Sequence, residues 1–494
     1  MFKTLKAVLF TFATLSLTLS AGATTTIRHH SGSVTDRYMV LLNTNISAAA
    51  YRGVVNSLQE SYGLQIVTEW REDPRGFVAN VPVSGAERLA NDPRVRVVEE
   101  DFRISFPTSA TQSTNWNGNY LWDLDRLDEP TYFSHDSTYD MCPEARDVNA
   151  YVIDTGVRAD HEQFTLNEPA SRVESYGFDS DSNPGYVDTT NGCPANANAW
   201  HGTAVASVLG GTSVGASKVH IVSLRVLDCT GVGFASNLVN AVNWIRSSSD
   251  PHRLQLGVAN LSVWRGDWTN DFTTLNIAVG ARVQTTLIPF FASANNFSGD
   301  ACKFAPASQA YTNTNHSGTV FTVGGTSLGA GGDMNDYRWQ TWTGGNTAAV
   351  GRDSGSNGGQ CVSIYAPGCD IYVASNSSTT AYGLFSGTSF SAPLTAGVAA
   401  RFIALTGING YQDVYNYLLT TAGSSSLINN VATPEYWMCY DSRVDLYYTY
   451  NFNPGSCGGL IGQDGTAGSQ AIHFSPTTNT SNAGMLYSSL SCPQ

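Results

Sequence analysis

Ser389 lies in a sequence context that suits a nucleophile. It belongs to the segment 385–393, FSGTSFSAP, which precedes an apolar stretch from Leu394 to Leu405. This stretch predicts a helix, and Pro393 suits its first turn because amides there have no partner within the helix. Ser389 would then lie beside free backbone N–H groups, which stabilise the oxyanion formed when a hydroxyl attacks a carbonyl carbon. The segment therefore predicts a nucleophile for acyl transfer.

A nucleophilic serine needs a general base and a carboxylate that orients the base, and the sequence contains a candidate for each. Asp154 ends a predicted buried strand in the segment 151–157, YVIDTGV. His201 begins a predicted helix of small residues in the segment 200–209, WHGTAVASVL. His201 would take the proton of the serine hydroxyl and return it to the leaving group, while Asp154 would hold the imidazole. A serine that caps a helix and a histidine in a core are the alternatives for each residue alone, but the three motifs together favour catalysis.

The order aspartate, histidine, serine, with Gly-Thr-Ser-x-Ser-Ala-Pro last, resembles that of the subtilisin-like serine peptidases, and of the proteinase K-like branch in particular. The resemblance covers residues 112–430. It implies a serine endopeptidase that hydrolyses peptide bonds in a broad range of proteins through an acyl-enzyme intermediate. It implies no cofactor for the chemistry. Structural calcium is compatible with the family, but the sequence locates no metal site.

The same resemblance provides a donor for the oxyanion. Asn295, in the segment 291–296 (FASANN), matches the family's oxyanion asparagine. Its side-chain amide would donate one hydrogen bond to the oxyanion, and the backbone N–H of Ser389 would donate the other. Asn296 is a competing assignment, and an asparagine in a turn is the alternative for either residue.

Two segments, 230–234 and 261–264, resemble the edges that pair with extended substrates in this family. The residues expected to contact substrate are Gly231, Val232, Gly233, Ser262, Val263, Trp264 and Ala294. Trp264 and Ala294 stand where glycines are usual beside the S1 pocket. If both side chains point inward they narrow the pocket and favour small P1 residues, whereas a solvent-facing Trp264 would reverse that preference. A further departure from the family is Trp200, which replaces the glycine usual before the histidine motif.

The elements that must position these residues alternate along the chain. Strands are predicted at 219–227, 256–263, 287–291 and 320–323, and helices at 235–245 and 275–284. This alternation predicts an α/β fold, in which a mainly parallel central sheet has helices on both faces. Ligands bind at the carboxyl ends of the strands in such sheets, and Asp154 and the segments 262–264 and 293–295 all follow strands. The predicted chemistry and the predicted architecture therefore agree.

A separate β-α-β-β-α-β succession precedes the catalytic motifs. Its strands are predicted at 38–42, 64–70, 77–81 and 95–99, and its helices at 46–62 and 84–89. This order is ferredoxin-like. Its place before a subtilisin-like domain resembles the family's inhibitory propeptide, which assists folding and then blocks the active site. An ordinary accessory domain is the alternative. A linker rich in Pro, Ser and Thr follows at 106–113, and the resemblance places the maturation cut near Ser109.

The N-terminus has the pattern of an export signal. Lys3 and Lys6 precede an apolar run from Ala7 to Leu19, and small residues follow at 21–23. We therefore expect a secreted protein. Its predicted parts are a signal peptide at 1–23, an inhibitory propeptide at 24–109, a catalytic domain at 110–430 and a C-terminal extension of unknown role at 431–494.

Charge and composition limit the partners of the chain. Among 494 residues, 40 acidic against 26 basic side chains give a formal net charge of −14, which argues against nucleic-acid binding. After the N-terminal run, no apolar stretch reaches the length of a membrane span. We expect a monomer whose partners are polypeptide substrates and its own propeptide, with neither nucleic acid nor membrane among them.

Export makes disulfides plausible for the nine cysteines. Similar positions are bridged in proteinase K-like members, and the resemblance therefore implies Cys193–Cys229 and Cys302–Cys361. The remaining cysteines are Cys142, Cys369, Cys439, Cys457 and Cys492. A bond between Cys439 and Cys457 is a guess, and at least one thiol must be unpaired or lost in processing.

Two other functions are compatible with parts of the sequence. Asp154-Thr155-Gly156 is also the active-site triplet of pepsin-like aspartic peptidases, and a second triplet begins at Asp353. However, a glycine-rich loop rather than a buried strand precedes Asp353, and this interpretation leaves His201 and Ser389 unexplained. A catalytically inactive secreted binding scaffold is the non-enzyme alternative. It would need a broken triad, and all three residues are present.

Overall fold

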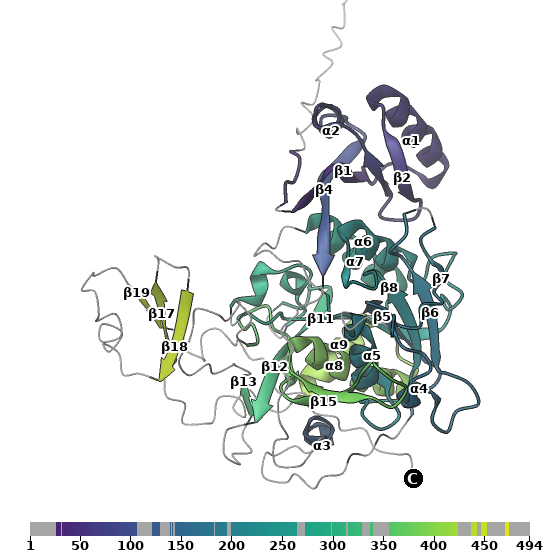
Figure 1. Ribbon diagram of the computed structural model, residues 1–494. Helices are drawn as coiled ribbons and strands as arrows, with labels where there is room; N and C mark the ends of the chain where they lie inside the picture. Colours follow the sequence, from purple (N-terminus) through teal and green to yellow (C-terminus); the bar gives the residue numbers. More distant parts are fainter. Residues whose placement is uncertain are drawn as a thin grey trace, which may run out of the picture.

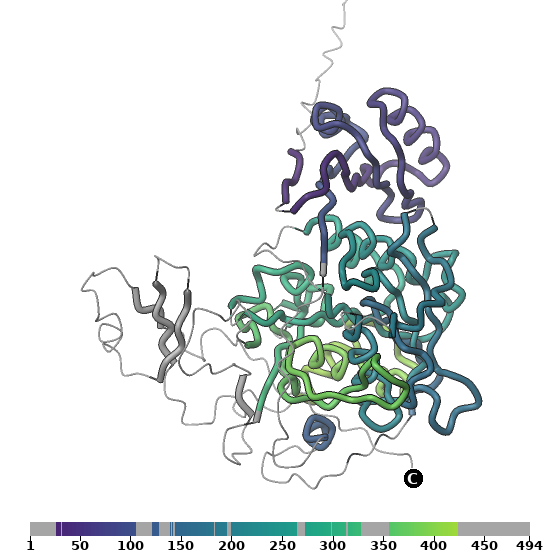
Figure 2. Tube along the Cα trace, viewed as in Figure 1, coloured from purple at the N-terminus to yellow at the C-terminus, as the bar shows by residue number. Residues whose placement is uncertain are grey.

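The structure is a computed structural model of the 494-residue chain. Figure 2 traces the chain from its N-terminus to its C-terminus. The described residues are 26–30, 32–105, 121–128, 139, 141, 144–181, 183–194, 199–263, 272–297, 299–312, 315–328, 336–338, 355–422, 436–441, 446–451 and 470–473. Several predictions fall outside them, namely the signal peptide at 1–23, Ser109, Trp264, Asp353, Cys142, Cys457 and Cys492.

A mostly parallel sheet forms the centre of residues 144–422, which the sequence predicts to be catalytic and which are called the catalytic part below. Its strands are β5 (Val148–Asp154), β6 (Val173–Gly177), β7 (Tyr186–Val187), β8 (His220–Arg225), β10 (Leu256–Leu261), β11 (Phe290–Ser293), β12 (Val320–Leu328), β13 (Asp336–Arg338) and β14 (Ile364–Pro367). The strand order is β13-β12-β11-β10-β5-β8-β6-β7, and β14 also pairs with β12. Only the pairs β6–β7 and β12–β13 are antiparallel among these described strands.

Helices cover both faces of this sheet. On one side lie α5 (His201–Gly210), α8 (Thr388–Thr406) and α9 (Tyr411–Thr421), and on the other lie α6 (Ala235–Trp244) and α7 (Thr273–Thr286) (Figure 1). Side chains alternate along β5 accordingly. Ala150 and Val152 pack with α5 and α8, while Tyr151 and Ile153 pack with α6 and α7. The predicted α/β architecture with a mainly parallel sheet is therefore confirmed.

Helix α8 begins earlier than the sequence pattern predicted. It starts at Thr388, so Ser389 lies in the first turn as expected, but Pro393 lies inside the helix and not in its first turn. Tertiary contacts hold the added turn, because Thr388 and Ser391 donate hydrogen bonds to Asn296 and to the carbonyl of Pro367. The prediction for the start of this helix was wrong because it relied on apolar periodicity, which does not reveal these tertiary contacts of polar residues.

Shorter elements connect the main ones. They are α3 (Trp122–Asp128), α4 (Glu162–Thr165), β9 (Val232–Phe234), the 3₁₀ helices η2 (Ala301–Lys303) and η3 (Ala307–Gln309), and the antiparallel pair β15 (Ile371–Ala374) and β16 (Tyr382–Phe385). Strands β17 (Tyr436–Asp441), β18 (Leu446–Asn451) and β19 (Gln470–His473) form a separate antiparallel sheet in the C-terminal segment. Strand β16 leads directly into the Ser389 segment.

An N-terminal unit packs against α6 and α7. Its elements are β1 (Ser33–Leu42), α1 (Ala48–Tyr62), β2 (Gln65–Trp70), β3 (Gly76–Asn80), α2 (Val83–Ala90) and β4 (Val95–Ser105). The four strands form an antiparallel sheet in the order β2-β3-β1-β4. Helices α1 and α2 cover one face of this sheet, and Met39, Leu41 and Val78 on the other face join the apolar cluster of α6 and α7.

Strand β4 is longer than the strand predicted at 95–99, and it leaves the N-terminal unit. It continues to Ser105 and runs into the catalytic part (Figure 1). There it pairs with β9. The strand therefore joins the two parts of the molecule through backbone hydrogen bonds.

Among the described helices, none by itself is long and apolar enough to cross a membrane. Helices α8 and α9 meet the criteria of length and composition only when they are taken as a pair, and they bend by 112° at the break between them.

Candidate active site

Asp154 and His201 form a buried pair at the carboxyl edge of the central sheet. Asp154 is the last residue of β5, and His201 is the first residue of α5. The Nδ1 atom of His201 lies 2.9 Å from both carboxylate oxygens of Asp154. The backbone N–H of Thr155 donates to Oδ1 of the same carboxylate at 2.7 Å, which fixes its orientation. Because Nδ1 faces the carboxylate, Nε2 is the imidazole nitrogen that remains to accept a proton.

The residues around this pair hold the helix against the strand end. The backbone N–H of Gly202 donates to Oγ1 of Thr155 at 2.9 Å, and that hydroxyl donates to the carbonyl of Ala199 at 3.1 Å. A Cβ atom on Gly202 would lie 2.4 Å from the carbonyl oxygen of Gly156. The glycine after the histidine is therefore required by the close approach of the two segments.

Ser389 is the second residue of α8, and Ser262 holds it on two sides. The Ser389 hydroxyl donates to the carbonyl of Ser262 at 3.4 Å. In return, the Ser262 hydroxyl donates to the carbonyl of Ser389 at 3.0 Å and accepts from Nδ2 of Asn260 at 2.9 Å. Pro393 has no N–H, so the helix cannot supply a hydrogen bond to the carbonyl four residues earlier, which is that of Ser389. The Ser262 hydroxyl takes the place of the missing amide.

The two neighbouring asparagines have different environments. Oδ1 of Asn296 accepts hydrogen bonds from the backbone N–H and the hydroxyl of Thr388, at 2.9 and 2.8 Å. The amide of Asn296 therefore holds the segment that carries Ser389. Asn295 has a positive φ of 75°, and its carbonyl accepts from the N–H of Asn357 at 2.8 Å. Its side-chain amide makes no hydrogen bond to any described residue, so it is the one that is available to a ligand.

An aromatic stack connects the histidine and serine segments. The Trp200 ring stacks on Phe385 with centroids 4.3 Å apart and an angle of 16°, and it meets the His201 ring edge-on at 5.4 Å. Phe385 is the last residue of β16 and the first residue of the serine segment 385–393. The sequence indicates that Trp200 departs from the family pattern, but it does not predict the stack because Phe385 lies far along the chain from Trp200.

The residues expected to contact substrate lie in different elements and are buried to different degrees. Val232 and Gly233 lie in β9, preceded by Gly231 with a φ of 80°, and a Cβ atom on Gly233 would lie 2.3 Å from a neighbouring carbonyl oxygen. Val263 follows the end of β10 and is buried. Ala294 is fully buried, and its methyl group packs in a small cluster with Ala301, Val362 and Tyr365. Because Trp264 lies outside the described residues, the preference for small P1 residues stays a prediction.

Both disulfides implied by the resemblance are present. Cys193–Cys229 joins the segment before His201 to the loop before β9, and Cys302–Cys361 joins η2 to the segment before β14. Their Cα atoms lie 5.5 and 5.1 Å apart. Cys369 is unpaired, and burial raises the pKa of its thiol to about 12, so the thiol is inert at neutral pH.

Comparison with known proteins gives the family. The model of the subtilase family, Peptidase_S8, matches residues 147–450. The chain belongs to the subtilase family. This confirms the resemblance and leaves the pepsin-like interpretation without support. The match also runs past residue 430, where the catalytic domain was expected to end.

Individual subtilases are similar to this one over most of its length. Alkaline serine exoprotease A of Vibrio alginolyticus is 32% identical over 350 residues, which are 71% of this chain and 55% of that protein. The extracellular serine proteinase of Thermus sp. (strain Rt41A) is 31% identical over 330 residues, which are 67% of this chain and 66% of that protein. This subtilase therefore spans between about half and two thirds of the length of these two relatives.

A solved structure shows the same fold. Fervidolysin from Fervidobacterium pennivorans, described as a keratinolytic enzyme related to subtilisin, superposes with a TM-score of 0.59 at 16% identity. The match covers 81% of this subtilase and 60% of fervidolysin. At this low identity the likeness concerns the fold alone.

Proposed function

We propose that this chain is a serine endopeptidase that hydrolyses peptide bonds through an acyl-enzyme. The observation that carries the proposal is the buried Asp154–His201 pair beside a helix that begins with the Ser389 segment. Nε2 of His201 takes the proton from the Ser389 hydroxyl as its oxygen attacks the scissile carbonyl, and gives that proton to the leaving amine. Asp154 holds the tautomer and stabilises the imidazolium. Water then attacks the acyl-enzyme by the same route, which releases the second product.

The oxyanion of each tetrahedral intermediate would accept hydrogen bonds from two donors. One is the side-chain amide of Asn295, which is free of described partners, and the other is the backbone N–H of Ser389 in the first turn of α8. Asn296 has a supporting role, because its amide oxygen is already engaged by Thr388. Preorganised donors of this kind stabilise the charge that develops in the transition state without reorganising.

The N-terminal unit is proposed to be the inhibitory propeptide of a zymogen. The end of β4 adds as an antiparallel strand to β9, with Arg103 opposite Phe234, Ile104 opposite Gly233 and Ser105 opposite Val232. Extended peptides are recognised by addition to a sheet edge in the same way. The chain therefore places its own segment where substrate is expected, directly before the proposed cut near Ser109.

Two carboxylates of β4 also cap helices of the catalytic part. Glu99 accepts from the N–H groups of Thr273 and Thr274 at the start of α7, at 3.1 and 2.8 Å. Asp101 accepts from the N–H and the hydroxyl of Ser236 at the start of α6, at 3.0 and 2.6 Å. Both carboxylates are fully buried, and a negative charge at a helix N-terminus is favourable. These contacts support a role for the N-terminal unit in folding the catalytic part.

We propose that the protein is secreted, with residues 1–23 as its signal peptide and 24–109, 110–430 and 431–494 as its successive parts. The two disulfides support this location, since such bonds persist in oxidising compartments. The Thermus relative is named an extracellular proteinase. The proposed substrates are unfolded or extended polypeptides of broad sequence, because strand addition is read mainly through the backbone.

A covalent label tests the proposal. A serine-reactive phosphonate should modify one residue of the exported chain, and peptide mass spectrometry should find it on Ser389. The label should be lost in His201→Ala, because the hydroxyl is activated by the imidazole. Label on another residue, or inactivation by a carboxylate-directed reagent only, would reject the assignment. A processed chain, free of residues 24–109, that folds but takes up no label would instead be a binding scaffold.

A further inference from the structure

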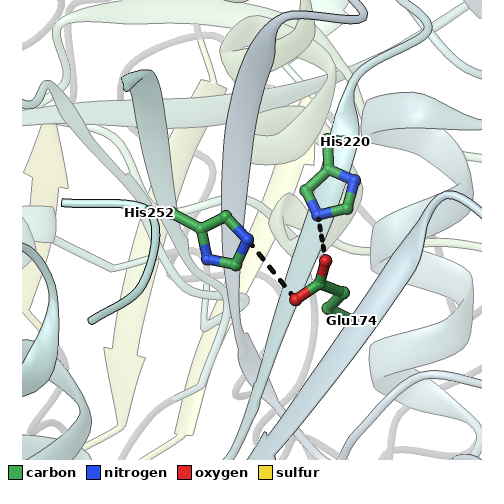
Figure 3. Close-up of side chains that lie close together, drawn as sticks. All are labelled: Glu174, His220 and His252. Carbon is green, nitrogen blue, oxygen red and sulfur yellow. Dashed lines mark ion pairs between the residues drawn. The ribbon is translucent and has the colours of Figure 1, made fainter. Parts of the chain in front are cut away.

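Three side chains that take no part in the proposed chemistry lie close together at the end of the central sheet opposite the active site. They are Glu174 on β6, His220 at the start of β8, and His252 in the segment between α6 and β10 (Figure 3). One ligand atom from each lies within 4.8 Å of the others. Figure 3 shows both imidazole rings turning a nitrogen toward the carboxylate of Glu174.

This cluster is remote from the active site. His220 pairs with Asn149 near the start of β5, whereas Asp154 ends that strand and pairs with Arg225. Five residues of a strand separate the two levels, which corresponds to about 16 Å. The cluster therefore lies at the amino edge of the parallel sheet, and the triad lies at the carboxyl edge.

The separations within the cluster are longer than direct hydrogen bonds and leave room for a cation. Nε2 of His220 lies 3.5 Å from Oε1 of Glu174, and Nε2 of His252 lies 3.4 Å from Oε2. Charged N–H···O hydrogen bonds are usually about 2.7–2.9 Å long. In contrast, two ligand atoms at about 2.0–2.2 Å from a tetrahedral Zn²⁺ ion are themselves separated by about 3.3–3.5 Å.

Polar groups lie next to two of the three ligands. Nδ1 of His252 faces Oδ1 of the fully buried Asp250 at 3.6 Å, and Asp250 is held by the Tyr151 hydroxyl at 2.8 Å and the N–H of Arg246 at 2.7 Å. A carboxylate behind a histidine ring is the usual partner of a metal-binding imidazole, although 3.6 Å is longer than a hydrogen bond. The Tyr176 hydroxyl donates to Oε2 of Glu174 at 3.2 Å.

The buried nitrogen of His220 gives a further reason to expect a ligand. Nε2 of His220 has no hydrogen bond within normal geometry to any described residue, although the atom is buried. Buried polar atoms are rarely left without a partner, because the loss of hydration is then not offset. A cation bound between the rings would satisfy this nitrogen.

We propose that Glu174, His220 and His252 bind a divalent transition-metal ion, Zn²⁺ by preference, at a site apart from the triad. Two imidazole nitrogens and one carboxylate oxygen suit Zn²⁺, whereas Ca²⁺ and Mg²⁺ take oxygen ligands. Water would complete the coordination. The ion ties β6 and β8 to the segment before β10, and so stabilises one end of the sheet without entering the peptidase reaction.

Metal titration of the full chain tests this site. The chain would carry Ser389→Ala to prevent self-digestion, and a chelator would first remove bound metal. We expect one equivalent of Zn²⁺ to bind with a dissociation constant in the micromolar range or below and to raise the melting temperature. An excess of Ca²⁺ should not displace it.

Matched variants locate the site. Glu174→Gln should fold normally because Glu174 is exposed, and His252→Gln provides a second test; each should weaken Zn²⁺ binding by at least about 100-fold. Glu144→Gln and His316→Gln change exposed residues outside the cluster and should leave binding unchanged. The proposal is overturned if no saturable binding occurs, or if Glu174→Gln binds Zn²⁺ as tightly as its parent. A rise in melting temperature with Zn²⁺ that persists in both cluster variants would also overturn it.

Discussion

Asp123 shows how one buried charge should make stability depend on pH. It lies in α3, where burial raises the pKa of its carboxyl to about 7, and the nearby amides of Asp123 and Leu124 offset only part of this rise. The folded state therefore holds a proton that the unfolded chain releases at lower pH. The stabilising effect of this proton is fully present below about pH 4 and is lost as the pH rises toward about 7.

Asp123→Asn should therefore stabilise the protein only where the carboxyl is charged. We expect its free energy of unfolding to rise by roughly 2–4 kcal/mol at pH 8 and to change little at pH 4. Denaturant unfolding of the Ser389→Ala chain at the two pH values measures this difference. Asp147→Asn, at an exposed position, is the matched control. An equal effect of Asp123→Asn at both pH values would show that the carboxyl is not protonated by burial.

The two asparagines should separate catalysis from stability. Asn295→Ala removes a donor to the oxyanion and should lower kcat by about 10²–10³ with little change in KM or melting temperature. Asn296→Ala leaves the N–H and hydroxyl of Thr388 without their acceptor and should cost roughly 1–3 kcal/mol of stability. Steady-state kinetics and thermal unfolding of both variants check this. Full activity in Asn295→Ala would remove that residue from the oxyanion site.

At the scale of single residues, the sequence predicts functional residues within short motifs and misses those whose role depends on distant contacts. Asp154, His201 and Ser389 each lie in a motif of about ten residues, so their types and order could be recognised. The choice between Asn295 and Asn296 depends on Thr388, which is 92 residues away. The cluster of Glu174, His220 and His252 has no local pattern at all.

At the scale of elements, the proline within α8 makes a double-mutant test available. Ser262→Ala leaves the carbonyl of Ser389 without a donor and should cost about 1–3 kcal/mol of stability. In Pro393→Ala the new amide can bond that carbonyl within the helix, so the same serine change should cost less. The unfolding free energies of the parent, the two single variants and the double variant measure the coupling, which we expect to be about 1 kcal/mol. Strictly additive costs would contradict the assigned role of Ser262.

Elements with a strong periodic pattern were the ones best predicted. The strands at β8 and β10 and the helix at α6 carry apolar residues with a clear period, and their predicted bounds lie close to those observed. The start of α8 was predicted too late because Thr388 to Ala392 has no regular apolar period and is held by tertiary contacts. Strand β4 was predicted too short because its last three residues pair with β9, a partner in another part of the chain.

At the scale of the whole molecule, the cap that Glu99 provides for α7 should strengthen inhibition of the enzyme by its N-terminal unit. Glu99→Ala removes two hydrogen bonds at the N-terminus of α7 and should weaken binding of the N-terminal unit by about 2 kcal/mol, or roughly 30-fold. The inhibition constant of residues 24–109 toward the processed enzyme measures this. Glu60→Ala, on the exposed face of α1, should have no effect. Equal inhibition by both variants would mean that the cap does not contribute to the interface.

The central claim is that Ser389 is the nucleophile of an exported peptidase, and its removal tests the claim most directly. The measurement is the rate at which the chain hydrolyses an unfolded protein, with Ser391→Ala as a control in the same helix, since that hydroxyl instead donates to the carbonyl of Pro367. Ser389→Ala should lower kcat by about 10⁶, and adding His201→Ala should lower it little further because the two residues act as a unit. Ser391→Ala should stay within about tenfold of the parent, because it touches none of the reacting atoms. A Ser389→Ala chain that hydrolyses the substrate as fast as its parent would contradict the account.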